Sequence, residues 1–109
     1  MRKLILILSF LSCVIFTACQ KQIAFNAQKW QKGKRLYEMT DSLIAKLDAE
    51  KPSKNEVLEL LGRPELKERI QEKEISYFLK ADGFISGWEL YIYFDDDGIY
   101  ESAEVSYFD

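Results

Sequence analysis

The residue with the most distinctive chemistry in this chain is Cys19, which follows a long apolar run in the stretch Ile15–Lys21, IFTACQK. A thiol in this position can form a disulfide, bind a metal ion, act as a nucleophile or carry an acyl chain. Cys13 is the only other cysteine, and the chain has no histidine. Zinc sites of Cys/His type and Cys-His nucleophile pairs therefore lack the residues that they need.

The segment before Cys19 has the three parts of a secretory signal. Met1–Lys3 is basic, Leu4–Phe16 is almost wholly apolar, and Thr17–Ala18 are small. A transmembrane helix needs about 20 apolar residues, and this run is shorter and is followed by polar residues. The sequence therefore predicts a signal peptide over residues 1–18.

The four residues Phe16–Cys19, FTAC, resemble the bacterial lipobox, in which a bulky apolar residue and two small residues precede a cysteine that is acylated before cleavage. Leucine is the commonest first residue of that motif, so Phe16 departs from it. The resemblance implies that Cys19 is lipidated and anchors the mature chain, residues 19–109, to a membrane. The alternative is that Cys19 is an ordinary small residue near the cleavage point of a common signal peptide.

Charge and missing motifs argue against several other functions. The whole chain has a formal charge of −3, and the mature chain is more acidic because Arg2 and Lys3 leave with the signal peptide. A net acidic chain does not favour nucleic acid, whose backbone binds clustered lysine and arginine. The sequence has no P-loop, no G-x-S-x-G and no dinucleotide-binding glycine motif. We therefore expect no enzyme, no cofactor and no small-molecule substrate.

The run Asp95–Gly98, DDDG, invites a calcium-binding interpretation. An EF-hand loop also needs an oxygen ligand at the position that Tyr93 occupies, and helices on both sides, which this sequence does not predict. Asp and Gly are common in tight turns between strands. We therefore predict a hairpin turn at these residues and no metal site.

Two segments of different composition follow the predicted cleavage point. Residues 19–31 are polar with isolated apolar residues and show no sustained period, which predicts a tether behind the lipidated cysteine. About ten extended residues reach about 33 Å, enough to hold a domain clear of a membrane surface. The folded domain is then expected over residues 32–109.

Two amphipathic helices are expected at the start of this domain. In residues 34–51, KRLYEMTDSLIAKLDAEK, apolar residues recur at spacings of three and four, although Thr40–Asp41 also fit the cap of a shorter helix. The second helix is bounded by a capping box at Ser53–Glu56 and by Gly62 and Pro64. It is too short to be stable alone in water, so it must pack on another element.

That element is predicted to be a sheet. Glu74–Lys80 and Trp88–Phe94 are rich in aromatic and branched residues, and a third strand is expected after the turn at Asp95–Gly98. Short connections join the three segments, so the strands are expected to be antiparallel. The sequence therefore predicts a two-layer α+β domain, ordered ααβββ, with two helices packed on one face of a three-stranded sheet.

Several aromatic residues of the predicted strands are candidates for binding a protein partner. In Trp88–Phe94, Leu90 and Ile92 alternate with Tyr91 and Tyr93, so these two tyrosines are expected on the face that the helices leave free. We take Tyr91, Tyr93 and Tyr100 as candidate contact residues, since exposed tyrosine is enriched at interfaces. The alternative is that these rings pair with neighbours and stabilise the sheet by about 0.2–1 kcal/mol each. Both interpretations remain open at the level of sequence.

Two stretches together resemble the SmpA/OmlA (BamE-like) family of small outer-membrane lipoproteins: KPSKNEVLELLGRPE, residues 51–65, and LYIYFDDDGIYESAEVSY, residues 90–107. The shared pattern is a capped helix that ends in V-x-x-L-L-G-x-P, then an aromatic strand, then L-x-I-x-F-D-x-x-G. Lys51–Ser53 and Ile99–Tyr100 depart from the residues usual in the family.

The resemblance implies a non-catalytic accessory lipoprotein that is anchored to the outer membrane of a bacterial cell envelope and faces the periplasm. It implies protein partners, among them components of β-barrel assembly, and a role in envelope integrity. The same arrangement of helices on a sheet occurs in inhibitors that block enzymes. An inhibitor or immunity-type module is therefore the alternative, because a fold alone does not fix a partner.

Overall fold

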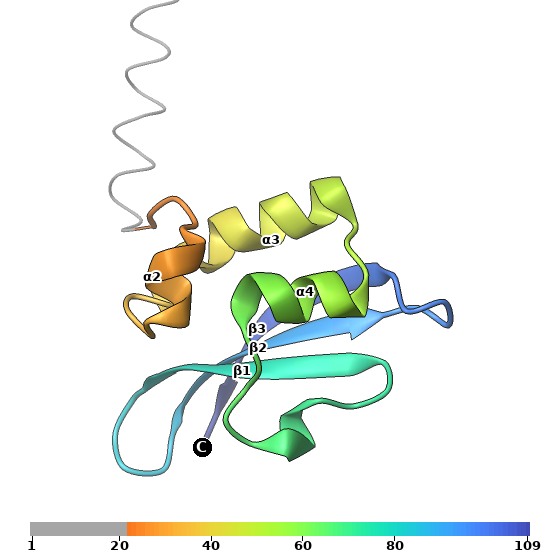
Figure 1. Ribbon diagram of the computed structural model, residues 1–109. Coiled ribbons are helices and arrows are strands. Elements are labelled where there is room, and N and C mark those ends of the chain that lie inside the picture. The colour runs from red at the N-terminus through yellow and green to blue at the C-terminus, as the bar shows by residue number, and fades with distance from the viewer. Residues whose placement is uncertain (1–21) are drawn as a thin grey trace, which may run out of the picture.

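The computed structural model describes residues 22–109, and the predicted signal peptide and Cys19 lie outside the described residues. Helices come first and a three-stranded antiparallel sheet follows, which confirms the predicted α+β fold and its ααβββ order (Figure 1). A further short helix precedes the two that the sequence predicts. Within the described part, no helix is long and apolar enough to cross a bilayer.

The sheet is open, and its strands lie in the order β1-β2-β3. β1 (Glu74–Ala81), β2 (Gly87–Phe94) and β3 (Tyr100–Phe108) pair antiparallel, close to the predicted segments. Successive side chains of a strand point to opposite faces, so Leu90 and Ile92 of the central strand turn inward and are fully buried. The α-helices lie on that inner face of the sheet (Figure 1). The outer edge of β1 is bridged near its start by Ile70, and Ser53 bridges Ile99 just before β3; no further strand pairs with either edge in the described residues.

The first predicted helix is shorter than its apolar pattern suggests. α3 (Thr40–Glu50) follows directly on η1 (Tyr37–Met39), a single turn of 3-10 helix, so its start agrees with the later of the two predicted starts. Leu43 and Leu47 lie on its buried face. Lys51 ends α3 in the left-handed conformation, with φ of 47°, and donates its N–H to the carbonyl of Leu47 at 2.8 Å.

α4 (Lys54–Leu61) has the predicted capping box. The N–H of Glu56 donates to Ser53 Oγ at 3.2 Å, and the N–H of Ser53 donates to the Glu56 carboxylate at 2.9 Å. Gly62 ends the helix with φ of 80° and ψ of 171°, a positive-φ conformation that is essentially restricted to glycine and differs from the left-handed helical one. Its carbonyl accepts the hydroxyl of Tyr77 at 2.8 Å, which ties the helix end to β1.

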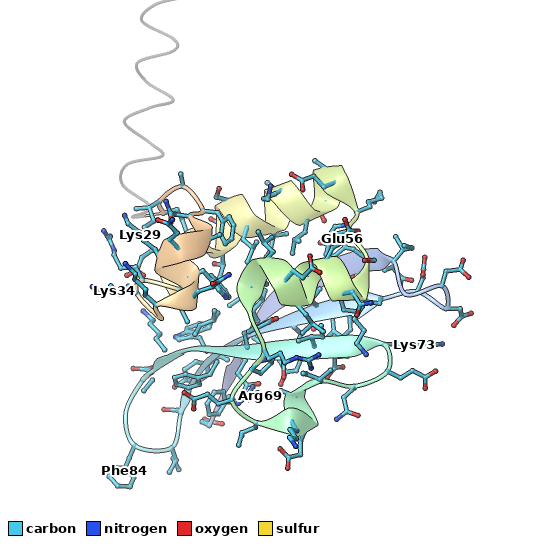
Figure 2. The ribbon with its side chains drawn as sticks, in the orientation of Figure 1. Lys29, Lys34, Glu56, Arg69, Lys73 and Phe84 are labelled. Carbon is cyan, nitrogen blue, oxygen red and sulfur yellow. The ribbon has the colours of Figure 1, made fainter. Side chains whose placement is uncertain are left out.

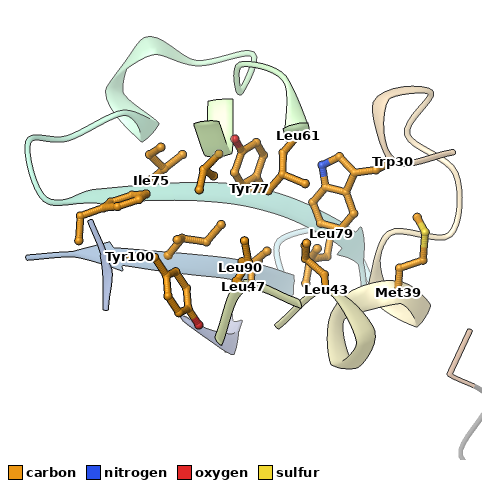
Figure 3. Packing of buried hydrophobic residues seen from close by; sticks show 13 residues of the cluster. Trp30, Met39, Leu43, Leu47, Leu61, Ile75, Tyr77, Leu79, Leu90 and Tyr100 are labelled. Atoms are coloured by element: carbon orange, nitrogen blue, oxygen red, sulfur yellow. The ribbon is translucent and has the colours of Figure 1, made fainter. Parts of the chain in front are cut away.

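Side chains from the helices and from the inner face of the sheet form one continuous core (Figure 3). Burying one large apolar side chain contributes about 1.5–3 kcal/mol. Residues 22–109 contain no cysteine, so packing stabilises this domain without a disulfide. The buried members are Trp30, Met39, Leu43, Leu47, Val57, Leu61, Ile75, Tyr77, Leu79, Leu90, Ile92, Phe94 and Tyr100.

The structure corrects the predicted tether of residues 19–31, because the described part of that segment packs on the domain. α2 (Ala27–Gln31) places Trp30 in the core, where the side chain is 3% exposed. Its ring contacts Tyr77 edge-on, with ring centroids 5.9 Å apart, and lies 6.1 Å from the ring of Phe25. Residues 22–31 are therefore part of the fold and not a flexible spacer.

Backbone hydrogen bonds attach the residues before α2 to the domain as well. The N–H of Ile23 donates to the carbonyl of Glu38 at 2.8 Å, and the N–H of Phe25 donates to Ser42 Oγ at 3.0 Å. α2 has five residues and is too short to show a hydrophobic period, so the sequence pattern does not predict this helix.

Candidate functional site

The outer face of the sheet is the first candidate surface. In the strand register Ser76 of β1 lies opposite Tyr91, and Tyr91 lies opposite Glu104 of β3. These side chains point away from the helices. The sequence placed Tyr91 and Tyr93 on this face, and the structure confirms that placement, with both side chains partly exposed.

Tyr91 and Tyr93 stack on one another along β2. Their ring centroids are 6.4 Å apart and the planes differ by 9°. The Tyr91 hydroxyl donates to Glu89 at 2.6 Å and the Tyr93 hydroxyl donates to Glu104 at 2.7 Å. The bond to Glu89 raises the pKa of Tyr91, and the bond to Glu104 raises the pKa of Tyr93 to about 12. Both hydroxyls are thus protonated donors at neutral pH, held by carboxylates of the same sheet.

Tyr100 does not lie on this outer face, so it is wrong as a candidate contact residue. The register shifts between Tyr93 and Phe94, where the ladder has an irregularity, and Tyr100 pairs with Phe94 on the inner face. Its side chain is 2% exposed, and its hydroxyl donates to Asp48 of α3 at 2.6 Å. Burial and this hydrogen bond raise the pKa of Tyr100, so the group is a structural donor between sheet and helix.

Tyr100→Phe is expected to lower the free energy of unfolding by about 1–2 kcal/mol, because it removes the hydrogen bond from this buried hydroxyl to the side chain of Asp48. Urea denaturation at pH 7 measures the change. Tyr107→Phe is the matched control, since its hydroxyl donates to Asp82 at 3.1 Å on an exposed side chain. Equal changes for the two variants would show that the Tyr100 hydroxyl does not link the layers.

A cluster of charged and polar groups lies next to the tyrosine pair. η2 (Lys67–Arg69) places Arg69 beside the sheet (Figure 2), where its guanidinium donates to Glu89 at 2.9 Å and to Ser76 Oγ at 3.3 Å. Partial burial by itself raises the pKa of Glu89, but the hydrogen bonds from Tyr91 and Arg69 outweigh it and hold that pKa below its ordinary value. The carboxylate is therefore charged at neutral pH and fixes η2 on the sheet.

Glu89→Gln is expected to lower the free energy of unfolding by about 1–2 kcal/mol at pH 7, where the native carboxylate is charged and hydrogen-bonded. The lowered pKa means that this stabilisation is complete above the ordinary carboxyl value of 4.5 and is lost as the pH falls through the folded-state pKa. The difference in unfolding free energy between the variant and the native chain should therefore shrink as the pH falls below 4.5, which urea titrations at successive pH values would show. Glu101→Gln, at an exposed position of β3, should show no such trend.

A groove beside β1 is the second candidate surface, and the sequence did not predict it. It has a volume of about 540 Å³ and lies between the end of α2, the end of α4, the segment before η2 and β1. Buried side chains form its apolar part, whereas Leu66 and Phe78 on its rim are 57% and 45% exposed. It is lined by Trp30, Gln31, Gly33, Leu36, Leu61, Arg63, Pro64, Glu65, Leu66, Arg69, Tyr77, Phe78 and Leu79.

The free edge of β1 borders this groove. The N–H of Phe94 donates to the carbonyl of Lys73 at 2.9 Å, and hydrogen-bonded pairs alternate along an antiparallel ladder. Tyr77 therefore shares hydrogen bonds with β2, while the N–H and C=O of Phe78 point to the free edge. The start of this edge is covered, because the N–H of Gln71 donates to the carbonyl of Glu74 at 2.7 Å and Ile70 forms a bridge with Ile75.

The acidic run Asp95–Gly98 forms the turn between β2 and β3. The Asp95 carboxylate accepts the N–H of Asp97 at 2.9 Å and the N–H of Ile99 at 3.0 Å, which confirms the predicted hairpin turn. Among residues 22–109, no group of three or more potential metal ligands lies close together.

The geometry defines a small α+β domain with two candidate protein-binding surfaces, the outer face of the sheet and the groove beside β1. Comparison with protein-family models, with curated proteins and with solved structures finds no match to this chain. The resemblance to the SmpA/OmlA family therefore stays a prediction from the sequence motifs.

Proposed function

We propose that this chain is a non-catalytic lipoprotein of a bacterial outer membrane, anchored through Cys19 and facing the periplasm, that binds a protein partner. The lipobox-like residues before Cys19 support the anchor. The absence of catalytic motifs from the sequence supports a binding role. A place in β-barrel assembly or envelope integrity rests on the motif resemblance.

The observation that carries the binding role is a groove with a partly apolar lining, next to the part of the β1 edge that no strand covers. An extended peptide can add a strand to such an edge, with its backbone supplying hydrogen bonds and its side chains entering pockets. Here the backbone groups of Phe78 are oriented toward the edge, and Trp30 and Leu61 offer apolar surface beside it. An exposed apolar rim of this kind is typical of an interaction site.

The occupant that fits this groove is an extended segment of a partner protein that carries apolar side chains and at least one carboxylate. Arg63 lines the groove, is exposed, and forms no ion pair within residues 22–109. Glu65 also lines the groove and forms no ion pair among the described residues. A carboxylate of the partner would therefore be bound only where it lies beside Arg63 and away from Glu65. Tyr91 and Tyr93 remain candidate contact residues on the adjacent face.

Photocrosslinking in intact cells tests the proposed site. A p-benzoylphenylalanine residue at Leu66 or at Phe78 should crosslink to the same short segment of one partner protein, identified by mass spectrometry. The same residue at Asn55, on the exposed side of α4, should give no crosslink. Positions Tyr91 and Tyr93 test the outer face in the same experiment.

Reversing the charge of Arg63 tests whether this residue binds the partner. Arg63→Glu should reduce the crosslink at Phe78 about fivefold to tenfold, since a charge pair at an interface contributes on the order of 1 kcal/mol. Lys67→Glu makes the same charge change outside the groove lining and should leave the yield unchanged. Equal crosslinks at Asn55, or a native yield for Arg63→Glu, would contradict the groove as the binding site.

The identity of the crosslinked partner tests the proposed role. Components of barrel assembly or an unfolded barrel precursor would support assembly of outer-membrane proteins. A single enzyme, inhibited one-to-one by this chain, would instead establish the inhibitor alternative.

A further inference from the structure

We infer that the end of the domain that carries α2 and the β1–β2 hairpin tip lies on an anionic bilayer surface and inserts the tip into it. This inference rests on the proposed lipidation of Cys19 and adds an orientation to it. Three independent features place the membrane at the same end of the molecule: the length of chain behind the anchor, a basic cluster and an exposed apolar tip.

The first feature is the short connection between the anchor and the fold. The chain is attached to the domain from Ile23 onward, through the hydrogen bond from its N–H to the carbonyl of Glu38. From Cys19 to Ile23 there are four peptide units, which span at most about 14 Å when extended. The predicted tether of residues 19–31 would have reached more than twice as far. A lipid on Cys19 therefore holds the start of the domain against the headgroups.

The second feature is a basic cluster, which we define as Lys29, Lys32, Lys34 and Arg35. All four side chains are exposed, and none forms an ion pair within residues 22–109. In Figure 2, Lys29 and Lys34 lie on the side of the molecule where the described chain begins. The acidic turn Asp95–Gly98 lies at the opposite end, beyond β2 and β3 (Figure 1). This separation of charge orients a net acidic protein on anionic headgroups.

The third feature is the tip of the β1–β2 hairpin. Phe84 is 103% exposed and Ile85 is 75% exposed, so both side chains project into solvent. Figure 2 shows Phe84 at the same side of the molecule as Lys34. Two acids lie near this end of the sheet: Asp82, whose carboxylate accepts the hydroxyl of Tyr107 at 3.1 Å, and Asp109, which follows the Phe108 that pairs with Gly87. An aromatic and a branched aliphatic side chain at a tip suit the boundary between headgroups and acyl chains.

A depth measurement on the acylated full chain tests this orientation. The acylated mature chain has no free thiol, because Cys13 leaves with the signal peptide and Cys19 is modified. Phe84→Cys and, as a matched control, Asp97→Cys can therefore each carry a single nitrobenzoxadiazole label. The labelled proteins are reconstituted into vesicles of phosphatidylethanolamine and phosphatidylglycerol, with spin-labelled lipid as the quencher.

The label at position 84 should be quenched by the spin-labelled lipid at least threefold more than the label at position 97, and its emission should shift to the blue. Replacing Lys32, Lys34 and Arg35 by glutamine should reduce quenching at position 84 at least twofold. These three side chains are exposed, so the fold should persist, and thermal melting followed by circular dichroism checks this.

Equal quenching at positions 84 and 97, with acylation of Cys19 confirmed by mass spectrometry, would overturn the inference and leave the proposed lipoprotein intact. Unchanged quenching after the triple glutamine replacement would also overturn it, because the basic cluster would then play no part. A chain that carries an unmodified Cys19 would instead take two labels and would contradict the proposed anchor itself.

Discussion

Trp30→Ala is expected to lower the free energy of unfolding by about 3–5 kcal/mol, the usual cost of truncating a buried aromatic side chain. The indole ring is 3% exposed and packs edge-on against Tyr77, so the variant leaves a cavity between α2 and the sheet. A loss of this size is a large share of the stability of a small domain. Urea denaturation followed by circular dichroism measures it.

The control for this prediction is Gln28→Ala, at an exposed position of the same helix. It should change the free energy of unfolding by less than about 0.5 kcal/mol. A large loss of stability for Trp30→Ala and a small one for Gln28→Ala would show that this segment is packed, as in the structure, and is not the flexible tether that the sequence predicts. Small changes for both variants would mean that residues 22–31 do not contribute to the fold.

Cys19→Ser is expected to abolish labelling by radioactive palmitate and to release or mislocalise the protein. A serine hydroxyl cannot accept the lipid that the proposed pathway adds to the thiol. Each buried methylene of an acyl chain contributes about 0.8 kcal/mol to membrane binding, so two or three acyl chains anchor the protein stably to the membrane. The basic cluster and the hairpin tip alone should retain only a salt-sensitive fraction on the membrane.

Cys13→Ser is the matched control, since the proposed cleavage removes this residue with the signal peptide. The variant should take up palmitate and fractionate with membranes like the native chain. Continued labelling of Cys19→Ser would show that the anchor is not on this cysteine.

The parts of the fold that follow from local sequence were predictable. The capping box at Ser53 and Glu56 uses side chains three residues apart, and the structure has both of its hydrogen bonds. The alternation of Leu90 and Ile92 with polar neighbours placed one face of β2 on the core. Helix capping and strand alternation depend on residues a few positions apart, so both can be predicted from a single sequence.

The features that the sequence did not reveal depend on distant contacts. Trp30 is buried because α2 meets the end of α4 and the ring of Tyr77, and no local period marks that docking. Tyr100 turns inward because the ladder slips by one residue after Tyr93. A one-residue slip moves a side chain to the other face of a sheet, which reverses the prediction for this tyrosine.

The groove was missed for a related reason. Its walls come from three segments that are far apart in the sequence, and the stretch from Arg63 to Lys73 has no regular pattern beyond the turn η2. Leu66 and Phe78 were the available signal, because large apolar residues in a polar context are candidates for an interface. The outer face was better predicted, since strand alternation alone placed Tyr91 and Tyr93 there.

The proposals together describe a domain held close to a membrane, with the groove beside β1 available to a partner. Trp30 and Gly33 line the groove at its α2 end, and α2 belongs to the end that we place on the bilayer. A partner segment in the groove would then be bound near the membrane surface. Such a position suits a partner that is itself inserted in, or about to enter, the same membrane.

The most direct test of the account is the intact mass of the protein purified from membranes of its own host. We expect the mass of residues 19–109 increased by a diacylglyceryl group on the Cys19 thiol, with or without a further acyl chain on the amino group. A chain cut elsewhere, or one that begins at Cys19 with a free thiol, would contradict the lipid anchor on which the proposed location and orientation both depend.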